Sequence, residues 1–525
     1  MEITTTTTPH SVTLPLISGG TFDLTINWGD GTANTTTVAY NGAGATHSYA
    51  APGTYVIAMR GVCTQMKFAN TGAMRTLVKK ITDCVDLGFT NLDFNGCTAL
   101  TKVSSKFSKL KSLTTCSSLF DGCTSLNNLP ADMFKGVGTN LTTAAPTYGG
   151  FCNTFRGCTS LTSIPATLFQ YNTALTTYAF PYTFSGCTSL TAIPDGLFDY
   201  AVSASASAFY GTFYNCSNAS LTSIPASLFE FNTGITTNAF YSTFYGCSKI
   251  TSLDPALFSH NTGITTTAFG STFRGCHGLT SLPATLFSAQ TGITTGAFTQ
   301  TFYDCYGLTS LPATLFSAQT GITTGAFDST FYGCYGLTLI PDGLLKYCTS
   351  CITFNTMFGA CTKAKLSALI FWDAGGRDTR FLNQSVDFSS CFSRSSWTGS
   401  TQGTAPDIWN CNFGTGTPTR SNCFAGAGNS ATSLSNYAEI QAAKLMTTNV
   451  APATDWAFGN TITGQTSGHT GVMRKKVSAT TWSIVLAAAA DTFHAAEQIG
   501  VTGDASKLAQ QTGSAPTFVT GWGAS

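Results

Sequence analysis

Charged residues are scarce in this chain: Asp, Glu, Lys and Arg make up 9% of its 525 residues, against about 25% in ordinary soluble domains. The 25 basic and 24 acidic residues leave a net charge of +1, so no general attraction to nucleic acid is expected. Only residues 60–111 are distinctly basic, and this stretch is either a solvated cap or a docking patch for an acidic partner. Thr, Ser, Gly and Ala fill the surface instead, which suits an extracellular or particle-bound protein.

Long apolar runs are also missing. No stretch reaches the 18 apolar residues that a membrane-spanning helix needs, so we expect no membrane insertion. The opening MEITTTTTPHSV has neither the basic start nor the apolar centre of a secretory signal. A surface-type protein of this kind has either lost its signal or reaches the outside by cell lysis.

Motifs that carry catalysis are absent as well. The chain has no GxGxxG, phosphate-binding loop, HExxH or GxSxG motif, and its six histidines are scattered. Polysaccharide-cleaving enzymes usually need paired carboxylates, and the central acidic residues form no regular ladder. We therefore predict a protein that is not an enzyme, with no catalytic residue, cofactor or metal.

What the chain does have is an internal repeat. The stretch that begins at Cys276 reads CHGLTSLPATLFSAQTGITTGAFTQTFYD and recurs from Cys305, 29 residues later, almost unchanged. Such self-similarity is the mark of a repeat architecture. Within one unit, LTSL fits a short strand, Pro283 the first residue of a helix over ATLFSAQ, and Thr295 the N-cap of a second helix. Stacked coils of this kind bury their apolar edges against one another.

The 19 cysteines follow the same frame. Eleven share one repeat position, so we expect them to stack inward as small apolar thiols that need no disulfides. CTSC at 348–351 is a lone CxxC pair, which makes zinc or redox chemistry a poor explanation. The eleven in register are Cys97, Cys123, Cys158, Cys187, Cys216, Cys247, Cys276, Cys305, Cys334, Cys361 and Cys391. The better disulfide candidates are Cys63, Cys84, Cys116, Cys152, Cys348, Cys351, Cys411 and Cys423.

Two segments resemble known families. FxGCTSLTSIPATLF, repeated over about 97–410, resembles the BspA-type leucine-rich repeats of bacterial and protist cell surfaces and some bacteriophages. WGDGT followed by HSYAAPGTYVI resembles the PKD-like β-sandwich, which in that family is a spacer or binding module. Within WGDGT, Asp30 either caps its own tight turn or contributes to a calcium site, and the first is favoured.

These features give a domain plan. The predicted fold class is mixed α/β, with a leucine-rich-repeat solenoid of about eleven coils between a small β-sandwich and a small α+β assembly domain. In the last of these, helices are expected over LSNYAEIQAAKLMTT (434–448), over the Ala-rich later part of 481–500, which begins like a strand, and over SKLAQQTG (506–513). The Thr-rich arm is expected to be disordered unless it lies against a neighbouring subunit or supplies strands to the sandwich. The segments are an arm (1–20), the PKD-like sandwich (21–62), a transition (63–96), the solenoid (97–391), a C-terminal cap (392–423) and the α+β or assembly domain (424–525).

Candidate binding residues lie where the coils differ most, around each Gly-Cys pair. Aromatic and basic side chains recur one residue before the Gly-Cys and one residue after the Cys. Stacked in a row, they form a platform for sugar rings or protein loops, or they merely cover the coil edges. The candidates are Tyr245, Arg274, His277, Tyr303, Tyr306, Tyr332 and Tyr335.

The resemblance and the composition together lead to a functional expectation. The chain is expected to be a non-enzymatic bacteriophage virion surface protein, a tail fibre, receptor-binding protein or capsid decoration. Its partners would be other virion proteins, further copies of itself, and a glycan or protein on the host surface. The alternative is a bacterial or protist cell-surface adhesin of the BspA type without its export signal.

Overall fold

The computed structural model describes residues 1–7, 10–70, 74–137, 141, 150–373 and 379–394, parts of 403–425, and seven strands between residues 444 and 519. The described parts of 403–425 are 403, 406, 408, 411, 413–419 and 421–425. Two compact units make up the chain. The first unit is Met1–Leu308 with Thr314–Ile322, and the second is Thr309–Ala313 with Thr323–Ser525.

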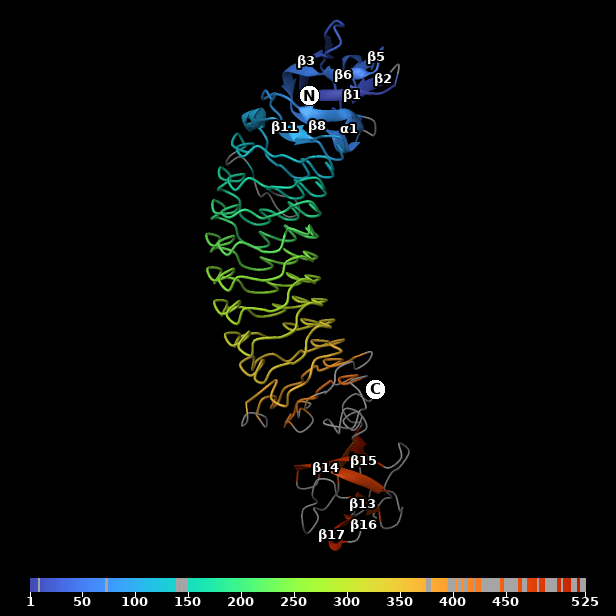
Figure 1. Ribbon diagram of the computed structural model, residues 1–525, viewed down its shortest axis with the longest axis vertical. Coiled ribbons are helices and arrows are strands. Elements are labelled where there is room, and N and C mark those ends of the chain that lie inside the picture. The colour runs from blue at the N-terminus through green and yellow to red at the C-terminus, as the bar shows by residue number, and fades with distance from the viewer. Residues whose placement is uncertain are drawn as a thin grey trace. The chain divides into compact units, whose positions relative to one another are not determined.

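The first unit begins with short strands (Figure 1). Its sheets have the strand orders β11-β9-β1-β6, β4-β3-β7, β2-β5 and β10-β8. One α-helix, α1 (Met74–Leu77), and three 3-10 segments, η1 (Ala43–Ala45), η2 (Phe68–Asn70) and η3 (Ser105–Lys109), connect them. The strands are β1 (Glu2–Thr5), β2 (His10–Thr13), β3 (Phe22–Asn27), β4 (Thr35–Thr37), β5 (Thr46–Tyr49), β6 (Gly53–Val56), β7 (Ala58–Cys63), β8 (Gln65–Lys67), β9 (Val78–Ile81), β10 (Asn91–Asp93) and β11 (Lys102–Val103).

Alternation of apolar and polar residues makes these strands. In β3, Phe22, Leu24 and Ile26 are buried while the residues between them are exposed, the pattern of a strand with one face on a core. The Thr-rich arm is ordered within the same chain, since β1 pairs with β6 and β9 and β2 pairs with β5. The arm therefore supplies strands and needs no neighbouring subunit to lie against.

After η3, the described residues of 110–373 contain no helix. In residues 267–276, alternate amides donate to the next coil, as Phe269 does to the carbonyl of Ala297 and Phe273 to that of Thr301. The amides between them close tight turns three residues back, as Thr272 does to Phe269. An α-helix needs its amides for bonds four residues back, and half of these amides are already used between coils.

The predicted mixed α/β fold class is therefore wrong. Among the described residues the only α-helix is α1, with four residues, and Figure 1 draws the coils after η3 without helix or arrow. LTSL forms no strand, and residues 283–290 and 295–305 form successive turns and not the two predicted helices. In residues 267–276 a left-handed residue recurs at every fourth position, at Thr267, Ser271 and Gly275, where φ is 51°, 53° and 72°.

Columns of identical side chains fill the interior of the coils. Phenylalanine rings at one repeat position stack with centroids 5.5–5.8 Å apart and nearly parallel planes. In successive coils from Thr154 to Thr301, a buried threonine donates its hydroxyl to a carbonyl of the preceding coil, as Thr272 does to Phe240 at 2.8 Å. The phenylalanines of this column are Phe120, Phe155, Phe184, Phe213, Phe244, Phe273 and Phe302.

Ten of the eleven cysteines predicted to share a repeat position, from Cys97 to Cys361, form a further column. Thiols of this column reach a phenylalanine carbonyl of the coil before, as Cys276 Sγ reaches that of Phe244 at 3.2 Å. All 19 cysteines are buried thiols, so the eight proposed as disulfide candidates form no disulfides. The prediction is wrong for Cys391, whose carbonyl accepts from the amide of Phe358 just as that of Thr301 accepts from Phe273. Cys391 therefore takes the place of the buried threonine, and Cys423 does the same one coil later, where its carbonyl accepts from Phe392.

The last part of the second unit is a seven-stranded antiparallel sheet in the order β17-β16-β13-β14-β15-β12-β18. The predicted α+β domain is thus wrong where it is described: residues 506–510, expected to be helical, lie in β17, and residues 444–447 of another expected helix form β12. Pairing with β16 overrides the helical propensity of SKLAQ. The expected Ala-rich helix falls mostly on 487–497, outside the described residues. The strands are β12 (Lys444–Thr447), β13 (Thr461–Gly464), β14 (Thr470–Ser478), β15 (Thr481–Leu486), β16 (Gln498–Val501), β17 (Asp504–Gln510) and β18 (Thr517–Val519).

Candidate functional site

Four successive coils of the first unit place an aromatic or basic side chain before the Gly-Cys position or its equivalent. The rings of Tyr214 and Tyr245 stack with centroids 4.3 Å apart and planes 10° apart. The guanidinium of Arg274 lies 5.4 Å from the ring centroid of Tyr245 and 4.1 Å from that of Tyr303. We call Tyr214, Tyr245, Arg274 and Tyr303 the aromatic row.

The backbone sets the spacing of this row. The amide of Gly246 donates to the carbonyl of Arg274 at 2.7 Å, and the amide of Gly275 donates to that of Tyr303 at 2.8 Å. Each side chain of the row is therefore held one coil from the next, and all four are half-buried. Arg274 Nη1 also donates to Gln300 Oε1 at 2.7 Å, which fixes the guanidinium between its two tyrosines.

Stacking changes what the row offers to a ligand. Tyr245 has Tyr214 against one face and Arg274 against the other, so its ring faces are covered. The row presents ring edges, phenol hydroxyls and a guanidinium instead of the open platform of ring faces that the sequence indicates. Ring edges carry partial positive charge, so the row favours hydrogen-bond acceptors.

A second line of tyrosines lies beside the row, four residues earlier in the chain. Tyr210 and Tyr241 stack at 4.9 Å, and Tyr182 meets Tyr210 edge-on at 5.4 Å. Burial raises the pKa of Tyr182 and of Tyr210, so these hydroxyls stay protonated. These three residues are not among the predicted binding residues, although the four-residue period visible in Tyr210–Tyr214 and Tyr241–Tyr245 indicates Tyr210 and Tyr241.

A surface hollow of about 380 Å³ adjoins the row. On one side, the rings of His277 and Tyr306 stack 4.3 Å apart with planes 2° apart. His277 Nδ1 lies 2.7 Å from the carbonyl oxygen of Asp304, so Nδ1 carries the proton and Nε2 is an acceptor when the ring is neutral. Burial raises the pKa of Asp304, and the nearby Arg274 and His277 partly offset this. The hollow is lined by Asn215, Tyr245, Gly246, Ser248, Arg274, Gly275, His277, Asp304 and Tyr306.

Five of the seven predicted binding residues thus gather in the first unit: Tyr245, Arg274, His277, Tyr303 and Tyr306. The remaining two belong to the second unit. Tyr332 is half-buried against Gly359, where an added Cβ would lie 2.8 Å from its ring, and Tyr335 is 42% exposed.

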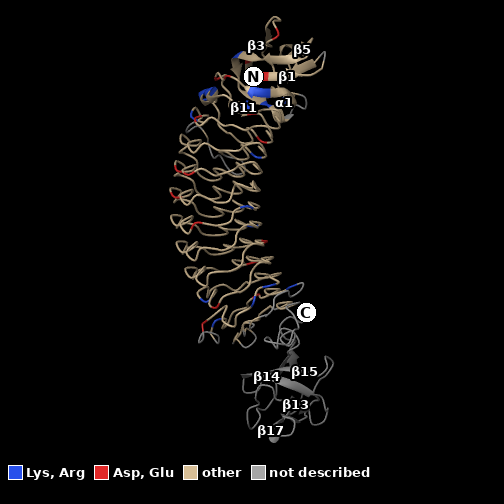
Figure 2. Ribbon diagram, in the orientation of Figure 1, with Lys and Arg blue, Asp and Glu red and all other residues tan. Residues whose placement is uncertain are grey.

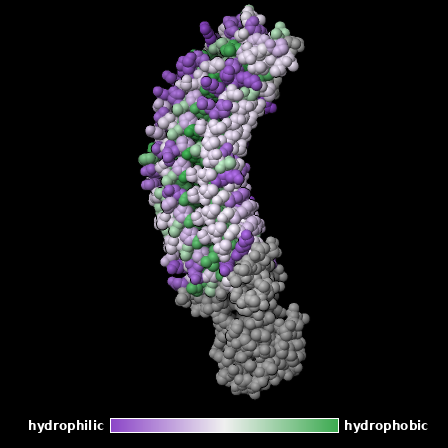
Figure 3. All heavy atoms as spheres, viewed as in Figure 1, coloured by the Kyte–Doolittle hydropathy of each residue, from purple (hydrophilic) through white to green (hydrophobic). Residues whose placement is uncertain are grey.

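The face of the molecule in Figure 3 is mostly pale over the coils, because small residues of intermediate hydropathy cover them. Charged residues are sparse along the coils and more frequent around β11 and α1, as the coloured ribbon of Figure 2 shows. Three carboxyl groups do come near one another on the coils, since burial, Glu230 and Asp195 all raise the pKa of Asp199. Ser227 Oγ donates to Asp195 at 3.0 Å, which holds that carboxylate in a structural bond.

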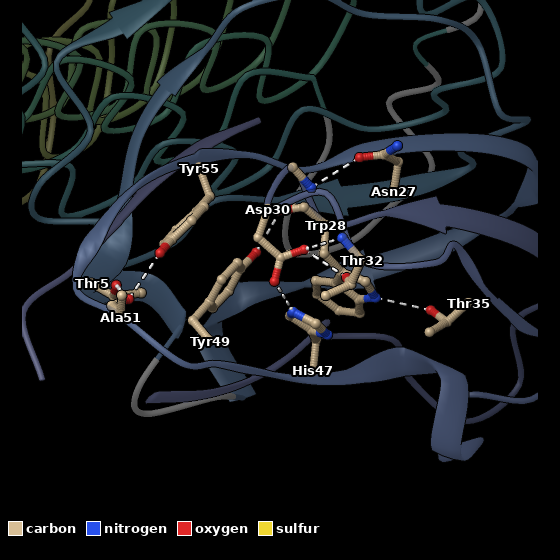
Figure 4. A network of polar contacts seen from close by, with 11 residues as sticks. Thr5, Asn27, Trp28, Asp30, Thr32, Thr35, His47, Tyr49, Ala51 and Tyr55 are labelled. Atoms are coloured by element: carbon tan, nitrogen blue, oxygen red, sulfur yellow. Dashed lines mark hydrogen bonds and ion pairs between the residues drawn. The ribbon is translucent and has the colours of Figure 1, made fainter. Parts of the chain in front are cut away.

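Asp30 caps its own turn in the N-terminal strands (Figure 4). Its Oδ1 accepts from the amide and the hydroxyl of Thr32 at 3.1 and 2.6 Å, and its Oδ2 lies 2.7 Å from His47 Nε2. Burial raises the pKa of Asp30, but the hydrogen bonds from Thr32 and His47 outweigh it and lower the pKa to about 2. Around this group Trp28 stacks on His47, and Tyr49 donates to the Trp28 carbonyl at 2.8 Å.

Within the described residues, no group of three or more His, Cys, Asp and Glu side chains is placed to hold a metal ion. The same residues include no helix with the length and apolar character to cross a membrane. No protein-family model matches this chain, and no curated protein matches it either.

Proposed function

We propose that this chain is a non-enzymatic attachment protein on the surface of a bacteriophage particle, and that it binds through the aromatic row. The observation that carries the proposal is the row itself, in which Tyr214, Tyr245, Arg274 and Tyr303 stack at consecutive coils. The interior columns repeat with little variation, so the departures at the surface stand out. Tyrosine and arginine are the residues that most often dominate binding surfaces.

The cysteines favour a virion protein over an exported adhesin. A chain with 19 cysteines that unfolds across a membrane into an oxidising space is prone to form disulfides. Here all 19 are buried thiols, which suits folding in a reducing cytosol and release by lysis. The adhesin remains the second candidate because the resemblance to BspA-type repeats applies to it equally. Neighbouring virion genes would support the first, and a longer reading frame with an export signal or anchor the second.

Binding to intact cells tests the attachment role. The purified chain is incubated with a panel of bacteria, and bound protein is measured by flow cytometry. In the double variant Tyr245→Ala, Tyr303→Ala we expect binding to weaken by at least about ten-fold, or ~1.4 kcal/mol. The double variant Tyr245→Phe, Tyr303→Phe keeps the stack but loses the hydroxyls, and we expect a similar loss.

Tyr200→Ala is the matched control, since Tyr200 is 47% exposed and outside the row. It should bind as the unmodified chain does. Cell binding that is unchanged in both double variants would remove the row from the attachment role.

A further inference from the structure

One surface column of the coils consists almost wholly of glycine. The residue before each in-register cysteine has a positive φ throughout, 69–73° at Gly157, Gly186, Gly246 and Gly275. A Cβ built on Gly275 would lie only 3.6 Å from the Cα of Gly246, so these glycines run directly one upon another. Without side chains they leave a channel along the surface.

In the first unit, two residues interrupt this column between Gly96 and Cys305. Asn215 and Asp304 take the glycine position with φ of 57° and 58°, a conformation that Asn and Asp tolerate better than other side chains. Both line the hollow described above, with Gly246 and Gly275 between them. The channel is therefore closed at both ends over three coil steps, about 14 Å at ~4.8 Å a step.

A third departure lies on the wall of the channel. The residue after the cysteine is Thr or Ser in the earlier coils, as at Ser248, but His277 and Tyr306 take this place next to the hollow. These two rings stack on each other and form an aromatic wall. Residues that break the repeat pattern and cluster at one place on the surface indicate a functional site, and not random sequence divergence between the repeats.

The polar groups around the hollow balance donors against acceptors. Arg274 and the Asn215 amide donate, the Asp304 carboxylate and His277 Nε2 accept, and Ser248 does both. Arg274 and Asp304 also cancel in charge. Sugar hydroxyls are donors and acceptors at once, so this set matches them, and about 380 Å³ is within the range of small-molecule sites. A sugar carboxylate would instead meet Asp304 with no second cation among the lining residues.

We propose that the hollow between Asn215 and Asp304 is a subsite for neutral sugar residues of a surface polysaccharide. This assignment rests on the proposed attachment function and names its ligand class. The row beside the hollow then contacts the continuing polymer through its hydroxyls. A peptide ligand is the competing occupant, and the experiment separates the two.

Restoring the repeat provides variants that keep the fold. Asp304→Gly and Asn215→Gly reinstate the glycine of the other coils, and His277→Ser reinstates the small hydroxyl residue, so the unfolding temperature should hardly change. Ala360→Gly makes the same kind of replacement at the equivalent position of the second unit, where φ is 59°, and is the matched control. Unfolding curves confirm that all four variants fold.

The probes are immobilised neutral oligohexoses, oligo-N-acetylhexosamines and oligouronates. We expect the unmodified chain to bind at least one neutral series and no oligouronate. Asp304→Gly and His277→Ser should each weaken that binding by at least about ten-fold, because each removes one hydrogen bond between the sugar and a carboxylate or an imidazole. Ala360→Gly should leave the binding unchanged. The assignment would be overturned if the unmodified chain bound only oligouronates or bound no neutral sugar. It would also be overturned if the Asp304→Gly variant bound the neutral sugar as tightly as the unmodified chain does.

Treated cells distinguish failure of this assignment from failure of the attachment role. Periodate destroys vicinal diols of surface sugars, and protease destroys surface proteins. Loss of binding after periodate supports the sugar subsite. If binding depends on Tyr245 and Tyr303 but survives periodate and is lost after protease, the attachment role stands and the sugar subsite is wrong. If no cell is bound, the attachment role fails, and the immobilised sugars alone decide the subsite.

Discussion

The N-terminal strands and the coils of the first unit satisfy their backbone amides in different ways. In the strands, pairing such as that of β3 with β4 and β7 uses the amides of both strand edges, and the apolar period is two. In coil segments such as 267–276, one amide in two bonds to the next coil and the other closes a turn, and the period is four. The comparison teaches that the choice of hydrogen-bond partners for the backbone amides, and not the content of apolar residues, decides which structure a segment of this chain adopts.

The two regions should also differ in how far the destabilising effect of a single substitution extends along the chain. Contacts in the strands come from distant parts of the sequence, whereas each coil contacts its neighbours in order. Stability in such stacked repeats is close to a sum of unit and nearest-neighbour terms. Substitutions in each region sharpen this contrast.

The largest effect is expected for Phe269→Ala. Phe269 is fully buried and contacts four rings: Phe240 and Phe298 at 5.7 Å, Phe258 at 4.9 Å and Phe287 at 4.8 Å. Its removal should lower the free energy of unfolding by about 3–5 kcal/mol. Amide hydrogen exchange should show lost protection in the coils around 240–298 and none in β3 or β7. Equal loss of protection in the strands would contradict the nearest-neighbour account.

A smaller effect is expected for Asp30→Ala in the strands. The substitution removes hydrogen bonds from Thr32 and His47 to a carboxylate, about 1.5–3 kcal/mol. Because the folded-state pKa of Asp30 is about 2, below its ordinary 3.8, the ionised group stabilises the fold above pH 3.8. That stabilisation is lost as the pH falls from 3.8 through 2. In the unmodified chain, the protection of β3 and β5 amides from hydrogen exchange should fall over this pH interval. If the Asp30→Ala variant lost protection with the same pH dependence, Asp30 would not be the cause of the loss.

Much of the stacking is predictable from the sequence. The 29-residue period places Cys276 and Cys305 at equivalent positions, and the structure stacks their column as expected. Tyr245, Arg274 and Tyr303 are found in one row because their repeat position is shared.

The backbone of the coils is not predictable in the same way. The buried positions of this segment have spacings that also fit one face of an α-helix, as at Ala297, Phe298, Phe302 and Cys305. Only a strict period of four distinguishes the successive turns of a coil from such a helix. The left-handed residues that recur at every fourth position are Thr, Ser or Gln at many places, such as Gln300, so glycine does not mark them. The covered ring faces of the row follow from stacking between coils, which no single repeat reveals.

Residues 506–510 illustrate a different limit. SKLAQ has the composition of a short helix, but the segment pairs with β16 in an antiparallel sheet. The partner strand lies elsewhere in the sequence, and local propensity carries no information about it. Tertiary pairing decided the structure there.

A density map of residues 150–320 at side-chain resolution tests the central claim most directly. The account predicts left-handed backbone at Thr267, Ser271 and Gly275, alternate amides bonded to the following coil, and the thiols of Cys247, Cys276 and Cys305 in one column. Continuous bonds from each amide to the carbonyl four residues before it, or thiols pointing to different sides of the coils, would contradict it.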